Sequence, residues 1–487
     1  MHVRSAGIAS GLLILICIPA MAQTPSAEVK KFIAHDDPAI ALTHVRVIDG
    51  TGAPAQEDRT IVLRNGRIES VGDGAAPTDA RVIDLAGRSV IPGLVGMHNH
   101  LMYTASINLD EDDKIPPPGF LVTELAFSAP RLYLASGVTT MRTTGSIEPY
   151  TDLNIRRLID DGRMPGPHID VTGPYLEGVD SFFPQMSALK TPDQAAKTVA
   201  FWTSQGATSF KAYMNIAADV LGAAIKEAHK HGVKVTGHLC SVDWRQAAAL
   251  GIDDLEHGPV YTDSEFVNDR KKDVCPQIPA IVASWEKLDI DSAPVKALID
   301  DLVKRHVAVT STLPVFEAGI TTRRVLSQRQ AQMLSAESLR SYLAARASAA
   351  VAPGRAEKAE AALKKEMAFE LAFVRAGGLL LAGPDPTGNG GTLPGFADQR
   401  ELELLVEAGF TPLEAIHIAT ANGATFEKRI DRIGTIAAGK QADLVVVKGD
   451  PSQKISDVEN VELVFKDGIA YDPAKLINSV RGMVGIR

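Results

Sequence analysis

The sequence predicts an α/β protein: a (β/α)8 TIM barrel joined to a small composite β-sandwich that both ends of the chain build. Between residues 92 and 424, apolar runs rich in β-branched residues alternate eight times with stretches of helical periodicity. Residues 39–91 and 425–480 instead hold short runs of alternating polar and apolar residues, typical of antiparallel strands. The 487 residues, 45% of them hydrophobic, are enough for a large core.

The N-terminal segment has the features of a secretory signal peptide. Arg4 supplies a positive charge, residues 7–18 are apolar, and Ala20-Met21-Ala22 forms a small-x-small cleavage site. The apolar run is shorter than the roughly 20 residues that cross a bilayer, so we expect cleavage after Ala22 and no integral membrane span. Residues 1–22 are therefore interpreted as a signal peptide, and the mature protein as periplasmic or secreted.

The two ends of the remaining chain contain similar strand patterns. Residues 39–91 read as short strands with a hairpin turn at Asn65-Gly66. Near the other end, ADLVVVKGD and VELVFKDGIAYD read as strands with a turn at Lys466-Asp467-Gly468. We expect these two ends to pair in one sheet.

The central region contains eight candidate parallel strands. They are residues 89–98, 137–145, 168–174, 207–215, 232–240, 251–259, 307–314 and 378–386. The helices between them carry ordinary start signals, such as Thr411 before Pro412 with Glu414 at the third position. Residues 104–128 and 325–375 are predicted insertions, the second of them helical.

Charge and cysteine content exclude several classes of protein. The net charge of −9 is spread along the chain without a basic tract, so nucleic acid is not an expected partner. The expected partner is a small-molecule substrate, and a homo-oligomer is possible. The acidic run Asp110–Asp113 is interpreted as a solvated loop. Cys240 and Cys275 permit at most one bridge, and the sequence leaves open whether they pair; buried free thiols are the favoured interpretation, since cysteine often behaves as a small hydrophobe.

Six side chains lie where the predicted strands end, and in a barrel those ends meet on one rim. They are His98, His100, Lys211, His238, His257 and Asp385. Because residues i and i+2 of a strand face the same side, His98 and His100 can chelate one cation, and neutral imidazole suits Zn²⁺. The bland alternative is a pair of hydrogen-bonded core histidines.

Lys211 and Asp385 each allow two interpretations from the residues alone. An ammonium group in an apolar strand is costly to bury unless it is paired or loses its charge, so Lys211 forms either a salt bridge or a carbamate with CO₂. Asp385 lies between prolines in a glycine-rich loop. It either caps a turn or serves as metal ligand and general base.

The chain resembles the amidohydrolase superfamily over nearly its whole length after the signal. The motifs that carry the resemblance are PGLVGMHNH, GVTTMRTTG, FKAYMN, VTGHLC, LEHG, AGPDP and GKQADLVVV, in this order. Within the superfamily it is most similar to the imidazolonepropionase- and prolidase-like branch, which includes ochratoxinase-like amidases. Lys211 matches the metal-bridging lysine of that branch.

The resemblance implies a centre of two divalent metal ions, with zinc as the default. His98, His100 and Asp385 would bind the first ion, His238 and His257 the second, and a CO₂-derived carbamate on Lys211 would bridge both. A hydroxide shared by two such ions attacks the scissile carbonyl. Asp385 would take the proton and pass it to the leaving amine.

The sequence departs from the branch at two loops. A histidine that often follows strand three and holds the substrate carbonyl is absent from TGPYLEGVDSFF, where Tyr175 is a possible replacement. The segment TTGS after strand two lacks the usual acidic residue. Substrate-binding residues are therefore unassigned. Arg323 and Arg324 could bind a substrate carboxylate, although solvated surface arginines are the favoured interpretation.

These features together predict an exported binuclear-metal amidohydrolase that cleaves an amide bond of a small substrate. Candidate substrates are a dipeptide (Xaa-Pro, or release of a C-terminal residue) and an N-acyl amino acid. A second hypothesis is hydrolysis of a cyclic amide, a lactone or an ochratoxin-like xenobiotic amide on the same metals. A third, a catalytically inactive periplasmic binding protein, is disfavoured because all six ligand positions are filled.

Overall fold

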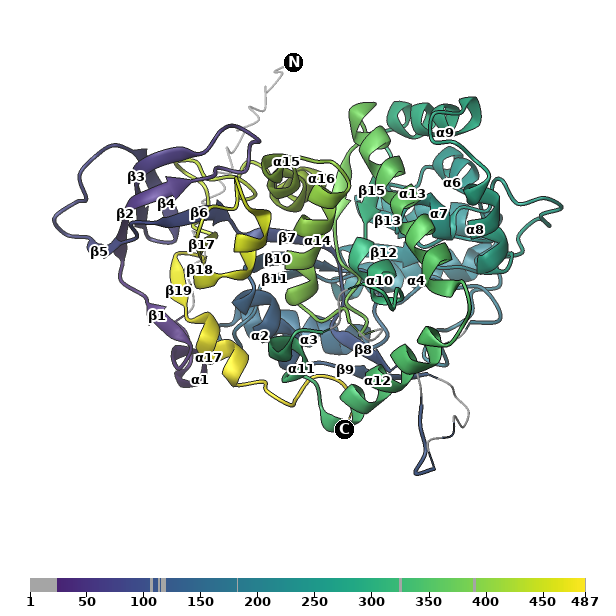
Figure 1. Ribbon diagram of the computed structural model, residues 1–487, viewed down its shortest axis with the longest axis horizontal. Coiled ribbons are helices and arrows are strands. Elements are labelled where there is room, and N and C mark those ends of the chain that lie inside the picture. Colours follow the sequence, from purple (N-terminus) through teal and green to yellow (C-terminus); the bar gives the residue numbers. More distant parts are fainter. Residues whose placement is uncertain are drawn as a thin grey trace, which may run out of the picture.

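A computed structural model of the chain describes residues 24–105, 108–112, 114, 120–181, 183–323, 326–388 and 391–486 (Figure 1). The predicted signal peptide, Asp113 and Arg324 lie outside these residues. Among the described residues, no helix combines the length and apolar character that a membrane span requires. Of the described acidic run, Asp110 is half-buried, and Glu111 and Asp112 are exposed.

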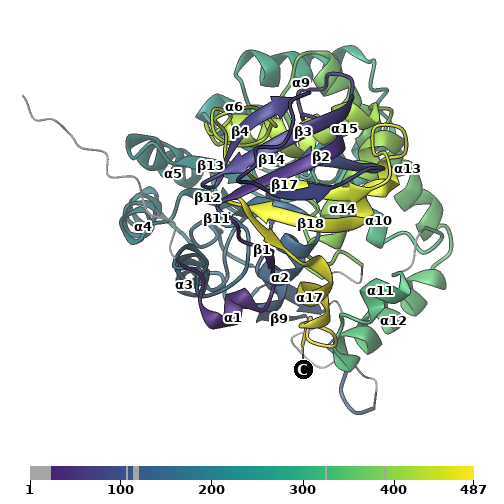
Figure 2. The same cartoon turned by 90° about the vertical axis from the view of Figure 1, so that its left-hand side faces the viewer.

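Both ends of the chain contribute to one nine-stranded sheet, which we call the composite sheet (Figure 2). Its order is β1-β19-β18-β17-β6-β2-β3-β4, with β5 beside β2. The ends meet where β17 pairs antiparallel with β6, Val446 opposite Val90. The strands are β1 (Ile33–His35), β2 (Ala39–Val47), β3 (Gln56–Arg64), β4 (Arg67–Gly72), β5 (Arg81–Asp84), β6 (Arg88–Pro92), β17 (Leu444–Lys448), β18 (Val461–Lys466) and β19 (Ile469–Tyr471).

The composite sheet buries apolar residues on both faces. On β17, Leu444 and Val446 point into a core that belongs to the sheet alone. Val445 and Val447 point the other way, into the large core shared with the rest of the protein. Because adjacent strand residues face opposite sides, the unbroken run LVVV is what a strand covered on both faces requires.

All eight predicted parallel strands form, in the predicted order. Their pairing divides into a three-stranded sheet, β11-β10-β7, and a five-stranded sheet, β12-β13-β14-β15-β16. Isolated parallel bridges join Thr172 to Ser209 and Leu176 to Ala212 between the two sheets. The strands are β7 (Leu94–Asn99), β10 (Val138–Thr143), β11 (His168–Asp170), β12 (Ser209–Ala212), β13 (Lys234–Gly237), β14 (Asp254–Glu256), β15 (Ala308–Ser311) and β16 (Leu380–Ala382).

The first and last of these strands also lie side by side, because the Asp385 N–H donates to the His98 carbonyl at 3.1 Å. A Cβ added to Gly383 would lie 2.1 Å from the backbone nitrogen of His98, so only glycine allows this approach. The described strands thus form two sheets with these close contacts at both junctions, and not one continuous eight-stranded ladder.

Helices cover the outside of the parallel strands, as Figure 1 shows on the side away from the composite sheet. The predicted helix start at Thr411 is confirmed, with a capping box to Glu414. The helices are α1 (Ala27–Lys30), α2 (Ser128–Ala135), α3 (Pro149–Asp160), α4 (Pro192–Gln205), α5 (Ala218–Lys230), α6 (Trp244–Leu250), α7 (Pro259–Thr262), α8 (Ile278–Glu286), α9 (Ala293–Lys304), α10 (Leu313–Ala318), α14 (Phe396–Glu407), α15 (Pro412–His417), α16 (Gly423–Phe426) and α17 (Pro473–Asn478).

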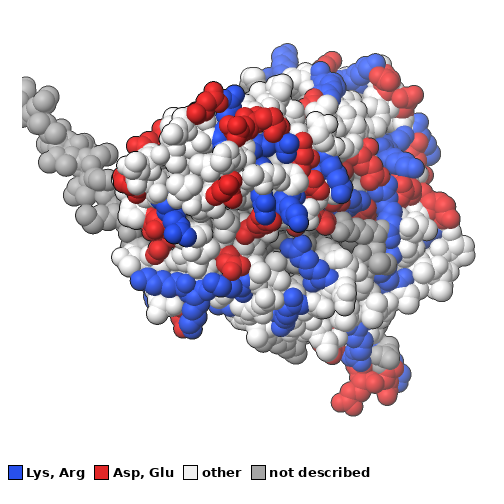
Figure 3. Space-filling model, turned by 60° about the vertical axis from the view of Figure 1, so that its left-hand side comes forward, with Lys and Arg blue, Asp and Glu red and all other residues white. Residues whose placement is uncertain are grey.

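The two predicted insertions have structure of their own. At the first, residues 104–128, the strand β8 (Met102–Ala105), which begins just before it, pairs antiparallel with β9 (Leu121–Glu124). Within 325–375, the helices are α11 (Gln328–Ala331), α12 (Ala336–Ala350) and α13 (Arg355–Arg375). On the face shown in Figure 3, both positive and negative side chains are spread over much of the surface.

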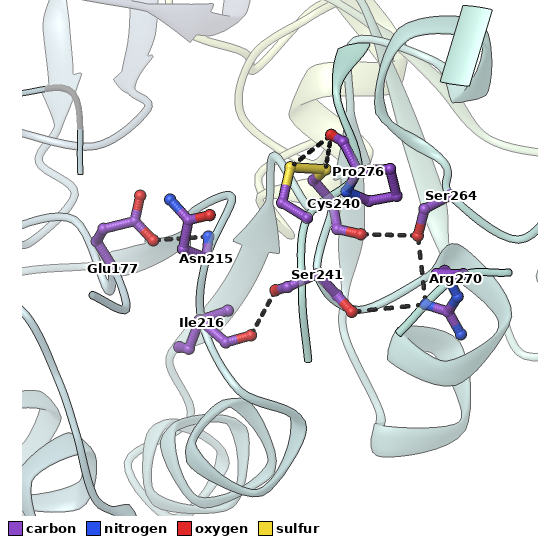
Figure 4. Close-up of a disulfide and its surroundings, with 9 residues drawn as sticks. Glu177, Asn215, Ile216, Cys240, Ser241, Ser264, Arg270 and Pro276 are labelled. Carbon is purple, nitrogen blue, oxygen red and sulfur yellow. Dashed lines mark hydrogen bonds between the residues drawn. A yellow bond between two sulfur atoms is a disulfide. The ribbon is translucent and has the colours of Figure 1, made fainter. Parts of the chain in front are cut away.

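The interpretation of Cys240 and Cys275 as free thiols is wrong, because the two form a disulfide with Cα atoms 4.8 Å apart. Figure 4 shows the bridge beside Pro276, with the Ser264 hydroxyl donating to the Cys240 carbonyl at 2.7 Å. Cysteine count allowed this bond, but nothing in the local sequence brings residues 35 positions apart together. The fold does so, by placing the segment before α8 against the end of β13.

Replacing both cysteines with serine is expected to lower the free energy of unfolding by about 4 kcal/mol. The estimate follows from the loss of a closed loop of 35 residues in the unfolded chain. Denaturant unfolding of the oxidised wild type and the double variant measures it. Reductant should destabilise the wild type and leave the variant unchanged, and equal stability of oxidised and reduced wild type would contradict the prediction.

Three buried glutamates lie outside the contacts so far described. Glu366 and Glu370 of α13 accept hydrogen bonds from the Val260 N–H and the Ser311 hydroxyl, each at 3.0 Å. Burial raises the pKa of both well above the ordinary value. Burial likewise raises the pKa of Glu401 in α14, to about 8. These carboxyl groups therefore favour the protonated state in the folded protein.

Glu401→Gln is expected to stabilise the protein more at pH 8 than at pH 5. The raised pKa in the folded state means that wild-type stability falls as pH rises from the ordinary value of 4.5 toward 8, and glutamine removes this dependence. We expect a gain on the order of 2 kcal/mol at pH 8 in denaturant unfolding. The exposed Glu286→Gln is the control; identical pH profiles for Glu401→Gln and wild type would refute the protonated state.

Candidate metal centre

The carboxyl ends of five parallel strands bring the six predicted ligands to one place. They are His98 and His100 at the end of β7, Lys211 in β12, His238 directly after β13, His257 directly after β14 and Asp385 beyond β16. All are buried except His238, which is half-buried. The structure therefore places all six predicted site residues in one cluster.

His98 and Asp385 lie at the centre of this cluster. Nζ of Lys211 is 3.0 Å from Nε2 of His98. Oδ1 of Asp385 is 3.0 Å from Nε2 of His100 and 3.5 Å from Nε2 of His98. These contacts bring a carboxylate, two imidazoles and an amine within reach of a common point.

His257 and His238 extend the cluster on the side of β13 and β14. Nδ1 of His257 is 3.9 Å from Oδ2 of Asp385, and the rings of His238 and His257 are centred 4.3 Å apart. Ligand atoms of His98, His257 and Asp385 all lie within 4.8 Å of one another. That spacing is short enough for one cation to contact all three.

His257 and Asp385 both have left-handed backbone conformations, with φ of 73° and 51°. This region is uncommon for residues other than glycine, and its cost persists only where surrounding structure imposes it. At His257 the structure around the next residue is tight, since a Cβ on Gly258 would lie 1.7 Å from Oε1 of Glu366. The backbone beside His257 thus has little room to change.

Hydrogen bonds orient two of the imidazoles. Nδ1 of His98 lies 2.6 Å from Oε2 of Glu256, and because an ionised carboxylate only accepts, Nδ1 must carry the proton. Nε2 of His98 then presents its lone pair to the cluster. Nδ1 of His257 is 2.9 Å from the Thr312 hydroxyl, while its buried Nε2 has no hydrogen-bond partner in the protein. A buried imidazole nitrogen without a hydrogen-bond partner in the protein is expected of a residue whose partner is a metal ion.

Burial favours the neutral form of three of the histidines. It lowers the pKa of His100 to about 4, lowers that of His238 to about 3, and holds that of His257 well below the ordinary range. For Asp385, burial alone would raise the pKa, but His98 and His100 outweigh it and hold the pKa well below the usual value. Neutral imidazoles beside an ionised carboxylate are the donor set that zinc and similar cations bind.

The Lys211 amine loses its proton more readily than that of an ordinary lysine. Burial lowers the pKa of its amine, although Glu256 and Asp385 oppose the shift. The amine faces the rings of Tyr175 and Tyr213, whose centroids are 5.7 and 5.8 Å from Nζ. No carboxylate in the described residues lies within 4.0 Å of Nζ, so the salt-bridge interpretation finds no partner there.

Sequence reasoning missed a buried ion cluster beneath the ligands. Arg142 of β10 donates from Nη2 to Asp254 at 2.7 Å and to Glu256 at 3.2 Å, and from Nε to the Met97 carbonyl at 2.8 Å. Glu256 is also the partner of His98. The available signal was the alternation in DLEH, which puts Asp254 and Glu256 on one side of β14 opposite a strand arginine.

The loop after β11 places Tyr175 at the cluster. Leu176 N–H donates to the Lys211 carbonyl at 2.9 Å, and Tyr213 N–H to the Leu176 carbonyl at 3.0 Å, so this loop runs along β12. Tyr175 packs over Gly145, where a Cβ would lie 2.4 Å from the ring. The segment TTGS thus has no acidic side chain, and its Gly145 leaves the space that the Tyr175 ring occupies.

Glu177 fastens the same loop to the next one. Its Oε1 accepts from the backbone N–H of Gly178 at 2.6 Å and from that of Asn215 at 2.8 Å. Figure 4 shows the second of these bonds. The ring of Tyr175 therefore has a fixed position next to that of Tyr213, 5.1 Å away.

A cavity of about 360 Å³ opens above the cluster, and we call it the strand-end cavity. Its size is within the range of small-molecule sites. The lining residues are His100, Met102, Thr104, Phe120, Tyr175, Phe183, Lys211, Tyr213, Met214, His238, His257, Tyr261, Thr262, Ile278, Val315, Phe316, Asp385 and Thr387.

Arg323 is neither a solvated surface residue nor free to bind a substrate. Its side chain is 14% exposed and pairs with Glu317, Glu360 and Glu407 at 3.3, 2.6 and 2.5 Å. Three carboxylates satisfy the guanidinium, so both interpretations of Arg323 were wrong. Arg324 lies outside the described residues.

A second group of potential ligands, His168, Asp443 and Asp467, joins β11 to the composite sheet. Its members pair internally. Nε2 of His168 lies 3.1 Å from Asp467, and Lys466 lies 3.1 Å from the same carboxylate. We assign this group a structural role, because the ammonium already supplies the positive charge a cation would bring.

The sequence pattern of the amidohydrolase family matches residues 89–470, most of the chain, and the protein belongs to this family. An N-substituted formamide deformylase from Arthrobacter pascens is 36% identical over 86 residues, 17% of this chain and 15% of that protein. An imidazolonepropionase from Vibrio cholerae is 39% identical over 56 residues, 11% of this chain and 14% of that protein. The chain thus spans only a small part of the length of these curated relatives.

Solved structures extend the similarity to nearly the whole chain. A Xaa-Pro dipeptidase with methionine in its active site has a TM-score of 0.63 and 21% identity, over 89% of this chain and 100% of that chain. A. niger ochratoxinase has a TM-score of 0.61 and 16% identity, over 90% and 96%. The resemblance predicted from the motifs is confirmed, and the shared fold is the TIM-barrel fold of this family.

Glu256→Gln is expected to weaken zinc affinity by about 10- to 100-fold, because it removes the charge that orients and polarises His98. Titration of the metal-free protein with zinc measures the change. Asp254→Asn is the matched control, since Asp254 contacts Arg142 and not His98. Equal loss of affinity in both variants would show that Glu256 acts only through the stability of the ion cluster.

Proposed function

We propose that the protein is an exported metal-dependent amidohydrolase that cleaves an amide or peptide bond of a small substrate. The observation that supports it most is the convergence of six potential ligands, of which five line one cavity and the sixth, His98, lies against Lys211 and Asp385. The residues that would hold two divalent ions, zinc by default, are His98, His100, Lys211, His238, His257 and Asp385. Bound ions of this kind activate water and polarise a carbonyl group.

Asp385 has the position and charge state of the proton carrier. It is ionised, because its pKa is held well below the usual value, and it lines the strand-end cavity. It would accept a proton from the attacking water and return it to the leaving nitrogen. Tyr175 and Tyr213 line the same cavity, and their hydroxyl groups are candidates to hold the substrate carbonyl.

Lys211 would serve as a carbamate. Its depressed pKa makes the neutral amine available, and addition of CO₂ forms an N–C bond with loss of one proton. The product is an anionic oxygen donor in place of a costly buried ammonium. This accounts for a lysine in β12 with no carboxylate partner among the described residues.

Two substrate classes follow from the fold family and the site. The first is a dipeptide or an N-acyl amino acid, supported by the structural similarity to a Xaa-Pro dipeptidase. The second is a cyclic amide, a lactone or a xenobiotic amide, supported by the aromatic lining of the cavity. A binding protein without activity has little support, because the ionised, strained Asp385 serves no evident purpose in one.

The location proposed is the periplasm or the exterior. Residues 1–22 have the composition of a cleavable signal, and the Cys240–Cys275 disulfide is the kind of bond that persists in oxidising compartments. A homo-oligomer is compatible with the proposal.

Lys211→Ala is expected to lower bound zinc to one ion or fewer per chain and to reduce amide hydrolysis at least about 1000-fold, because the bridging donor is lost. Metal analysis and release of amine from a panel of dipeptides, acylated amino acids and aryl amides measure both effects. The exposed Lys197→Ala is the control. Unchanged zinc content and turnover in Lys211→Ala would refute the bridging role, and no cleavage by zinc-loaded wild type would refute the function.

A further inference from the structure

We infer that the strand-end cavity selects neutral, apolar amides, aromatic ones above all, and rejects substrates that carry a free carboxylate. The inference rests on the proposed function and decides between its two substrate classes. It follows from the shape and chemistry of the cavity walls.

Two aromatic pairs form walls beside the metal centre. Tyr175 and Tyr213, from the loops after β11 and β12, contact edge to face with centroids 5.1 Å apart. Tyr261 and Phe316, from α7 and α10, stack in parallel with centroids 3.8 Å apart and planes 6° apart.

Both pairs approach the cluster closely. The Tyr213 ring is centred 4.9 Å from that of His238, and the Phe316 ring 6.0 Å from that of His257. Flat apolar groups gain from burial against such surfaces, both by loss of hydrated area and by ring contacts. An aryl or alkyl group on either side of the scissile bond therefore has a matching surface.

The described remainder of the lining is mostly apolar. It includes Met102, Met214, Ile278 and Val315, and its uncharged polar residues outside the aromatic pairs and the ligand cluster are three threonines. Methionine adapts to varied apolar shapes, which suits a cavity that accepts more than one such substrate.

The described lining offers a carboxylate no counter-charge. Lys211 is its only lysine or arginine, and the cluster already engages it. Arg323 is held by three glutamates. Away from the metal centre, a carboxylate bound against these walls would lose its hydration without an ion-pair partner among the described lining residues, and this loss opposes binding.

Matched amides test the selectivity in zinc-loaded wild type. In one pair, 4-acetamidoacetophenone and 4-acetamidobenzoate differ in charge on the amine side; in the other, N-phenyl-4-acetylbenzamide and 4-(phenylcarbamoyl)benzoate differ on the acyl side. We expect kcat/KM about 100-fold higher for the neutral member of each cleaved pair. Equal or higher kcat/KM for the carboxylates would overturn the inference and leave the hydrolase function intact.

Equilibrium binding of the same four compounds, measured by calorimetry, distinguishes failure of the selectivity from failure of the proposed hydrolase function. If no amide is cleaved but the neutral compounds bind more tightly, the proposed function fails and the selectivity stands. If the carboxylates bind as tightly as their neutral partners, the selectivity fails. The same comparison is made in Arg324→Ala. If the wild type prefers the carboxylates and this variant does not, Arg324 is the counter-charge, and the inference is overturned.

A charge placed on the wall provides an independent test. Val315→Arg should shift the ratio of kcat/KM toward the carboxylate substrates by more than about tenfold, because it adds a charge-assisted hydrogen-bond donor. Val351→Arg is the control, since Val351 is 80% exposed and does not line the cavity. An unchanged ratio in folded Val315→Arg would contradict the view that absence of a cation sets the selectivity.

Discussion

The contact between Glu256 and His98 is the constraint on which the rest of the site depends. It fixes which imidazole nitrogen faces the cluster, and Arg142 in turn holds Glu256. Burial alone would raise the pKa of Glu256, but His98 and Arg142 outweigh it and keep the pKa below the ordinary range. Arg142 on β10 thus helps to keep this carboxylate ionised and, through it, the first ligand oriented. β10 itself contributes no ligand.

Much of the fold and the cluster could be predicted from the sequence, because both depend on local patterns. The eight apolar runs became parallel strands, and the six polar residues at their ends met, since side chains at strand ends follow strand order. The buried partners Arg142 and Asp254 were not predicted, because they lie 112 residues apart on strands of different sheets, and their contact depends on how the two sheets face each other. The disulfide and the ion pairs of Arg323 were missed for the same reason: both depend on how loops pack.

The composite sheet explains how the chain ends support the centre. β6 leads directly into β7, whose last residues carry His98 and Asn99, and β17 pairs with β6 along its length. The far end of the chain therefore stabilises the strand that delivers the first ligands. Asn99 lies between the two histidines and donates to Asp398 at the start of α14 at 3.0 Å, so the segment is held from two directions.

The bridge between Cys240 and Cys275 has a consequence for how the protein is assembled and produced. It closes a covalent ring that contains His257 and begins two residues after His238, so both imidazoles of one side of the cluster are tied to a single oxidised loop. Protein made in a reducing cytosol would lack this ring. Recombinant material from such a host should be reoxidised before its metal content or turnover is judged.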